Sequence, residues 1–188
     1  MEQSNEELIA LYVRGNENAF EELTRRNLTM VYSFALRFTG SEYDAEDITQ
    51  ETFVKVWRNI HRYKVSAGKF TTWLMRIARN TAVDKIRKKK QIPFSTFETA
   101  QGKNILEETV SDTELLAEEM MIRGEDEKDL QEAITTLPPS QRDVLLLHYT
   151  NRLTFEEIGK ILKQPTNTVK SRHYRALIIL RKLLDASP

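Results

Sequence analysis

Apolar residues recur at intervals of three and four along most of this chain, a spacing typical of α-helices that bury one face. Gly15 and Gly40 interrupt the first stripe and are expected at helix ends. With only 6 Gly and 5 Pro in 188 residues, a turn-rich β architecture is disfavoured. The predicted fold class is therefore all-α. The stripe of the first forty residues comprises Leu8, Leu11, Tyr12, Phe20, Leu23, Met30, Val31, Phe34, Ala35 and Phe38.

The helical pattern divides the chain into two small domains. Helices are predicted over about 43–60 and 70–90, separated by a loop at 61–69, and the second should end before Pro93. Between 93 and 127 acidic and small polar residues dominate, apart from a helix-like patch at 115–121, which predicts a linker. The expected domains are 1–92 and 128–188, joined by this acidic linker.

Capping signals give the second domain its expected order of helices. Pro138 and Pro139 end one apolar stripe, and Ser140 could cap the next helix. Thr154 and Glu157 form a capping box before a helix at 155–162, and Thr166 could cap a last helix to about 184. A short helix, a tight turn and a longer helix together predict a helix-turn-helix.

Composition excludes several classes of protein. The absence of cysteine excludes disulfides and thiolate metal sites. No apolar run approaches the roughly 18–20 residues that a membrane span needs, and the acidic, polar N-terminus does not resemble a signal peptide. We therefore expect a cytoplasmic protein without membrane insertion or cofactor.

The net charge is zero, but the charges are strongly segregated. Residues 61–92 carry 10 basic side chains and 1 acidic one, and residues 137–188 carry 9 and 4. The intervening 93–136 carry 3 and 12, and residues 1–60 carry 6 and 11. Two basic blocks separated by an acidic one indicate two surfaces for polyanions.

Both basic helices have two distinct faces. In the last helix, the face expected to turn inward holds Val169, His173, Ala176, Leu177, Leu180 and Leu184. Its opposite face offers cations, a hydroxyl and an aromatic ring near the helix start, where base edges are read: Asn167, Lys170, Ser171, Tyr174 and Arg175.

The helix at 70–90 divides in the same way. Its inward face holds Trp73, Leu74, Ile77, Ala78, Ala82 and Ile86, and its outward face holds Arg76, Asn80, Asp84 and Arg87, followed by lysines. A basic helix beside a loop containing Tyr63 and Phe70 suits single-stranded DNA, which needs stacking surfaces as well as phosphate neutralisation. Solvated faces and core aromatics would give similar patterns.

Carboxylates cluster between Asp44 and Glu51 on a third helix. Clustered carboxylates can hold magnesium, as in all-helical nucleotide pyrophosphohydrolases. Such an enzyme needs a second carboxylate-bearing helix facing the first, and the sequence supplies no convincing one. We expect no metal and no catalytic residue.

Three blocks resemble the extracytoplasmic-function sigma factors, in the order and spacing of that family. The run 44–57 (DAEDITQETFVKVW) resembles their helix that binds core RNA polymerase. The run 70–87 (FTTWLMRIARNTAVDKIR) resembles their segment that melts the promoter and reads its −10 element. The segments LPPSQR at 137–142, TFEEIG at 154–159 and TVKSRHYRA at 168–176 are similar to their −35-reading domain.

The resemblance implies a role for each block. Contacts to the polymerase clamp would come from Asp47, Gln50, Glu51 and Val54. The −10 element would be melted and read by Tyr63, Lys64, Phe70, Arg76, Asn80, Asp84 and Arg87. The loop around 63–70, with Asn80, would form the pocket for a flipped base. The −35 element would be read by Thr168, Lys170, Ser171, Arg172, Tyr174 and Arg175, with Arg172 on phosphate.

Two positions depart from the family pattern. Asn167 stands where glycine is common, and His173 stands where leucine is usual. We expect His173 to be a core or interface histidine.

The resemblance also implies the partners: core RNA polymerase, promoter DNA and an anti-sigma protein. The alternative is a stand-alone DNA-binding regulator that uses only its helix-turn-helix and needs no polymerase.

Overall fold

The computed structural model describes residues 3–90 and 127–185, and within them every regular element is helical, which confirms the all-α prediction. The N-terminal domain contains α1 (Asn5–Val13), α2 (Glu17–Thr39), α3 (Glu42–Asn59) and α4 (Phe70–Lys90). Two 3₁₀ turns, at Ile60–Arg62 and Val65–Ala67, lie in the connection predicted as a loop. The predicted linker falls outside the described residues, except for its last one.

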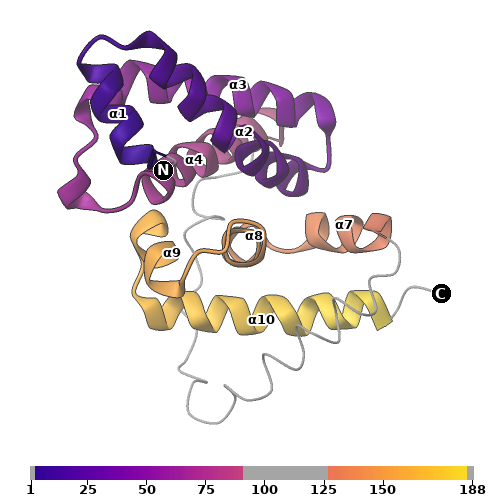
Figure 1. The fold of residues 1–188 in the computed structure, drawn as a ribbon. Coiled ribbons are helices and arrows are strands. Elements are labelled where there is room, and N and C mark those ends of the chain that lie inside the picture. The colour runs from indigo at the N-terminus through magenta and orange to yellow at the C-terminus, as the bar shows by residue number, and fades with distance from the viewer. Residues whose placement is uncertain (1–2, 91–126, 186–188) are drawn as a thin grey trace.

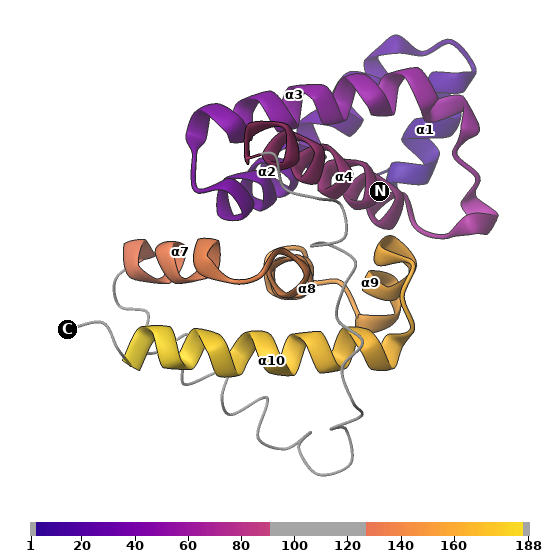
Figure 2. The ribbon, with the colours of Figure 1, turned by 180° about the vertical axis from the view of Figure 1, so that it is seen from behind.

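The C-terminal domain contains α7 (Glu127–Thr136), α8 (Pro139–Tyr149), α9 (Phe155–Leu162) and α10 (Thr166–Asp185). The two domains form two layers (Figure 1), and α7, α8 and α9 lie between α10 and the N-terminal domain. The view from behind shows the same order (Figure 2). No helix in the described ranges is both long and apolar enough to cross a bilayer.

Side-chain caps explain where several helices begin. The Ser4 hydroxyl accepts the backbone N–H of Glu7, whose carboxylate accepts the Ser4 N–H in return. Thr154 and Glu157 make the same reciprocal pair before α9, as the sequence predicts. Each capping box satisfies two N–H groups that have no partner within the helix.

The helix boundaries differ from the predictions in two places. Pro138 rather than Ser140 occupies the N-cap of α8, and Pro139 is its first residue, where proline's missing N–H costs nothing. Helix α10 begins at Thr166 itself. The left-handed residue of the helix-turn-helix is Lys163, at φ 54°, whereas Asn167 is helical.

One apolar core runs through both domains. Its largest fully buried side chains include Phe34, Phe38 and Phe70 in the N-terminal domain and Leu146 and Leu147 in the C-terminal domain. Helices α7 and α8 pack on α2, and α9 packs on α4. The two domains therefore share an extensive interface.

Close backbone packing requires a glycine in the helix-turn-helix. A Cβ on Gly159 would lie 2.8 Å from the carbonyl oxygen of Gln164. Cβ atoms in proteins essentially never make so short a contact. The same turn is closed by the Gln164 N–H, which donates to the Gly159 carbonyl at 3.0 Å. A side chain at 159 would push apart the two helices of the motif.

We predict that Gly159→Ala lowers the free energy of unfolding by about 1–3 kcal/mol, because the added methyl overpacks the turn against backbone that cannot rotate away. Urea unfolding followed by circular dichroism measures the change. Glu156→Ala, at an exposed site on the same helix, is the control and should change stability by less than about 0.5 kcal/mol. Equal effects of the two substitutions would contradict the packing argument.

Candidate protein and nucleic-acid interfaces

The outer face of α3 presents the residues predicted to bind polymerase. Gln50, Glu51 and Val54 are exposed and Asp47 is half-buried, so the structure places all four on an accessible face. Glu51 pairs with Lys55 on its own helix at 2.8 Å, and Asp47 accepts from Lys85 of α4 at 2.6 Å. This ion pair with Asp47 raises the pKa of Lys85.

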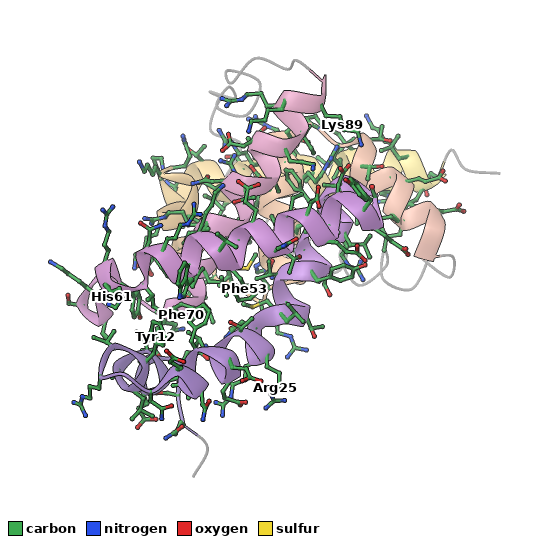
Figure 3. The ribbon with its side chains drawn as sticks, turned by 90° about the horizontal axis from the view of Figure 1, so that it is seen from above. Tyr12, Arg25, Phe53, His61, Phe70 and Lys89 are labelled. Carbon is green, nitrogen blue, oxygen red and sulfur yellow. The ribbon has the colours of Figure 1, made fainter. Side chains whose placement is uncertain are left out.

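An apolar groove lies beside these carboxylates, between α2 and α3. Its volume is about 690 Å³, and its lining includes Gln50 and Val54 together with Leu28, Phe53 and Trp57. Trp57 leaves 53% of its surface exposed. Figure 3 looks down on this domain and shows Phe53 among its helices. Exposed apolar area next to carboxylates is typical of a protein-binding surface.

Three carboxylates of α3 pair with separate lysines. Asp44 accepts from Lys89 at 2.8 Å, in addition to the pairs of Asp47 and Glu51. Among the described residues no group of three or more His, Asp or Glu side chains could hold a metal ion.

The loop before α4 is anchored by Glu6 of α1. Its carboxylate accepts the backbone N–H of Phe70 at 3.0 Å and the Tyr63 hydroxyl at 3.3 Å. The single hydroxyl hydrogen of Tyr63 is shared between Glu6 and the Gly68 carbonyl oxygen, which lies 2.8 Å from the hydroxyl. Burial, together with the charge of Glu6, raises the pKa of Tyr63 to about 12. This anchor was not predicted, because only the fold brings residue 6 to residue 70.

The structure places Phe70, one of the two aromatic residues predicted to face single-stranded DNA, in the core. Phe70 is 0% exposed and packs edge-on against Tyr63, with ring centroids 5.8 Å apart. Its ring therefore packs inside the protein and is not offered to a base. Tyr63 is half-buried, and Lys64 is exposed.

The outward residues of α4 are accessible to different extents. Asn80 is exposed, and its carbonyl oxygen is 3.4 Å from an Arg79 donor. Asp84 and Arg87 form a half-exposed pair at 3.4 Å. Arg76 donates to the backbone carbonyl of Lys160 in α9 at 2.6 Å. The C-terminal domain thus covers one edge of the predicted −10 surface.

The two faces of helix α10 are buried and exposed as predicted. Val169, Ala176, Leu177 and Leu180 are buried, and Lys170 is exposed. Thr168, Ser171, Tyr174 and Arg175 are partly exposed, so the predicted −35 surface is accessible near the start of the helix.

Arg172 is placed differently from the prediction. Only 3% of it is exposed, and it lies close enough to Asp143 of α8 and Arg79 of α4 to interact electrostatically with both. Burial is the main cause that lowers its pKa. In this arrangement the Arg172 side chain is not accessible to a phosphate.

His173 is a core histidine in an aromatic cluster. Its Nε2 lies 3.1 Å from the Tyr149 hydroxyl, and its ring packs against Phe155 and His148, with centroids 5.0 and 5.2 Å away. Burial, reinforced by His148, lowers the pKa of His173 to about 4. The cluster joins α8, α9 and α10. Leucine is usual at position 173 in the family that the sequence resembles.

Comparisons with known proteins agree with this layout. The family model of sigma-70 region 2 matches residues 23–92, and that of sigma-70 region 4 matches residues 127–180. The ECF RNA polymerase sigma factor SigW of Bacillus subtilis is 35% identical over 186 residues, covering 98% of both chains. The chain belongs to the ECF sigma factors. It directs promoter-specific transcription initiation with RNA polymerase, as a non-enzymatic factor.

Two other relatives are similar to this ECF sigma factor, and two solved structures share its fold. SigE of Mycolicibacterium smegmatis is 33% identical, covering 88% of this chain and 62% of the relative, and the sigma-H factor of Pseudomonas aeruginosa is 29% identical, covering 98% and 95%. CnrH, solved with the cytosolic domain of CnrY, shares the fold with a TM-score of 0.71 at 23% identity, covering 99% and 100%. RpoE of Bartonella quintana, solved with the anti-sigma factor NepR, gives 0.66 at 21%, covering 90% and 98%.

We predict that His173 makes stability depend on pH. Because its pKa falls from an ordinary 6.5 to about 4 on folding, the stabilisation is complete above pH 6.5 and is lost as the pH falls toward 4. The loss by pH 4 should be roughly 3 kcal/mol. Urea unfolding of wild type and His173→Leu between pH 4 and 8 measures it. A stability difference between the two proteins that stays constant over this range would contradict the prediction.

Proposed function

We propose a division of labour among the surfaces of this sigma factor. The outer face of α3 binds the clamp of core RNA polymerase through Asp47, Gln50, Glu51 and Val54. The loop before α4 and the outward face of that helix melt and read the −10 element. The start of α10 reads the −35 element as duplex. Domain 1–92 then serves polymerase and −10 binding, domain 128–188 serves −35 binding, and 93–127 connects them.

The observation that carries this proposal is the accessibility of one chemically distinct surface for each partner. A clamp needs a protein-binding face, and α3 supplies carboxylates beside an apolar groove with an exposed Trp57. Duplex DNA needs a basic helix that fits the major groove, and α10 presents Lys170 and Arg175 within its first three turns.

For the −10 element, exposed Asn80 and Lys64 support a role in binding separated strands. An amide can hydrogen-bond the edge of a flipped base, and the lysine can neutralise phosphate. Arg76 joins this surface once α9 moves away from it. Phe70 contributes by holding Tyr63 in place.

The same proposal includes a cytoplasmic location and an anti-sigma partner. RpoE of Bartonella quintana was solved with the anti-sigma factor NepR. If the chain bound DNA tightly without polymerase or any other protein, it would instead be a stand-alone regulator that uses α9 and α10 alone. Co-purification of the chain with core polymerase separates these two functions: retention supports the proposal, and its absence supports the regulator.

Docking on polymerase predicts that Glu51→Lys lowers affinity for core polymerase by at least tenfold while leaving the melting temperature nearly unchanged. Glu51 is exposed, and its i,i+4 pair with Lys55 contributes little to stability. Reversing a charge at an interface costs binding free energy because like charges then face each other. Fluorescence anisotropy of labelled protein with core polymerase measures the affinity. Glu21→Lys, exposed on α2, is the matched control, and equal affinities of the two variants would remove this assignment.

Reading of the −35 element predicts that Arg175→Ala costs about 1–3 kcal/mol at one base position and relaxes the preference there. Run-off transcription from promoters with single-base changes in the −35 element measures the preference. Lys182→Ala, exposed toward the other end of α10, is the control that should leave the preference unchanged. If Arg175→Ala lowers transcription from every promoter by one common factor, Arg175 contacts phosphate and does not read a base.

A further inference from the structure

The loop that precedes α4 lies almost entirely in solvent. All six residues from Lys64 to Lys69 are exposed, and Val65 on the second 3₁₀ turn leaves 65% of its surface exposed. The Gly68 N–H donates to the Val65 carbonyl at 3.2 Å, which closes that turn. This short-range bond shapes the turn but does not fix where the turn lies relative to α4.

Helix α1 supports both ends of this loop. At its start, Tyr12 packs near His61, with ring centroids 6.1 Å apart. At its end, one oxygen of the Glu6 carboxylate accepts the Phe70 N–H at 3.0 Å and lies 3.3 Å from the Tyr63 hydroxyl. Figure 3 shows Tyr12, His61 and Phe70 gathered at one end of the N-terminal domain. The loop is therefore tied to a residue 57 to 64 positions earlier in the chain.

Glu6 caps α4 from outside that helix. Phe70 is the first residue of α4, and the first four N–H groups of a helix have no partner within it. The preceding Lys69 has a side chain that can only donate hydrogen bonds, so it cannot cap this N–H itself. A carboxylate at a helix N-terminus makes a charge-assisted hydrogen bond and interacts favourably with the helix dipole. Glu6 supplies that carboxylate.

The same carboxylate helps to hold an aromatic cluster at the end of the loop. The rings of Tyr63, Phe70 and Trp73 contact one another, with centroids 5.6 to 5.9 Å apart. Burial, reinforced by the charge of Glu6 and its hydrogen bond, raises the pKa of Tyr63 to about 12. The hydroxyl therefore stays protonated at neutral pH and remains able to donate to Glu6 and to the Gly68 carbonyl.

We propose that Glu6 is a positioning residue for −10 reading, which holds residues 63–69 in the shape that receives a flipped base. This proposal rests on the −10 role proposed above for the loop and Asn80. The family model of region 2 begins at residue 23, so it does not include α1. Glu6 itself contacts no base and acts through the Phe70 N–H and the Tyr63 hydroxyl. A loop that is already held in its bound shape loses less entropy on binding.

Hydrogen exchange followed by mass spectrometry tests the anchor in the free, full-length protein. Glu6→Ala should speed exchange of the amides of residues 63–70 by about tenfold, because the Phe70 N–H loses its acceptor and the loop loses its tether. Exchange in α10, in the other domain, should stay unchanged and reports that the protein remains folded. Glu17→Ala, at an exposed carboxylate in the first turn of α2, is the matched control and should leave the loop unchanged.

Two further variants separate the anchor from a general loss of stability. Glu6→Gln keeps an oxygen that can accept the Phe70 N–H and should restore most of the protection. Tyr63→Phe removes only a hydroxyl and should speed the same exchange by a smaller factor than Glu6→Ala. If Glu6→Ala also speeds exchange in α10, Tyr63→Phe decides alone. Unchanged loop exchange in both Glu6→Ala and Tyr63→Phe would overturn the anchor.

Open-complex formation by the reconstituted holoenzyme tests the positioning role. The probes are two pools of promoter DNA, one randomised across the −10 element and one across the −35 element, and the DNA retained in open complexes is sequenced. Glu6→Ala should lower the preference for the favoured base at one −10 position by about threefold, because fewer molecules hold the competent loop shape. The −35 preferences and the affinity for core polymerase should not change, and Glu6→Gln should restore the −10 preference. A protein that is merely less stable would lose both preferences or neither.

Asn80→Ala distinguishes failure of this proposal from failure of the proposed −10 surface. If Asn80→Ala alters the −10 preference and Glu6→Ala does not, the positioning role of Glu6 is wrong, while the −10 surface stands. If neither variant alters the preference, the −10 surface fails and the positioning role fails with it. The exchange measurement still shows in that case whether Glu6 anchors the loop.

Discussion

A carboxylate with no exposed surface must be neutralised by its neighbours, and Asp143 imposes this requirement at the centre of the molecule. Its neutralising groups come from α4 of one domain and α10 of the other. Arg79 of α4 reaches Asp143 of α8 at 2.5 Å, and Arg172 of α10 is buried within electrostatic range of the same carboxylate. Hydrophobic contacts alone would allow the two small domains to slide, whereas a hydrogen-bonded ion pair favours one geometry.

The apolar core and the helix-turn-helix could be predicted from sequence because they depend on local patterns. The stripe of Val169, Ala176 and Leu180 shows which face of α10 is buried, and the Thr154–Glu157 box shows where α9 begins. The exposed positions on α3 follow from the same periodicity. Each of these features is contained within one helix or one turn.

The remaining features depend on residues far apart in the chain. Glu6 binds the N–H of Phe70 across 64 positions, and Arg79 reaches Asp143 across the same separation. Periodicity treats a charged residue such as Arg172 as solvent-facing, and so it misplaced this one. A clue was present at Asp143, which adjoins the apolar run of residues 144–147, where an unpaired carboxylate would be costly.

The ion pairs between α3 and α4 have a consequence for the thermodynamics of DNA binding. Lys85 and Lys89, which belong to the most basic stretch of the chain, are already neutralised by Asp47 and Asp44. Cations that are paired within the protein displace fewer condensed counterions from a nucleic acid than free cations do. The affinity of the free N-terminal domain for DNA should therefore change less steeply with ionic strength than its ten basic residues between 61 and 92 would suggest.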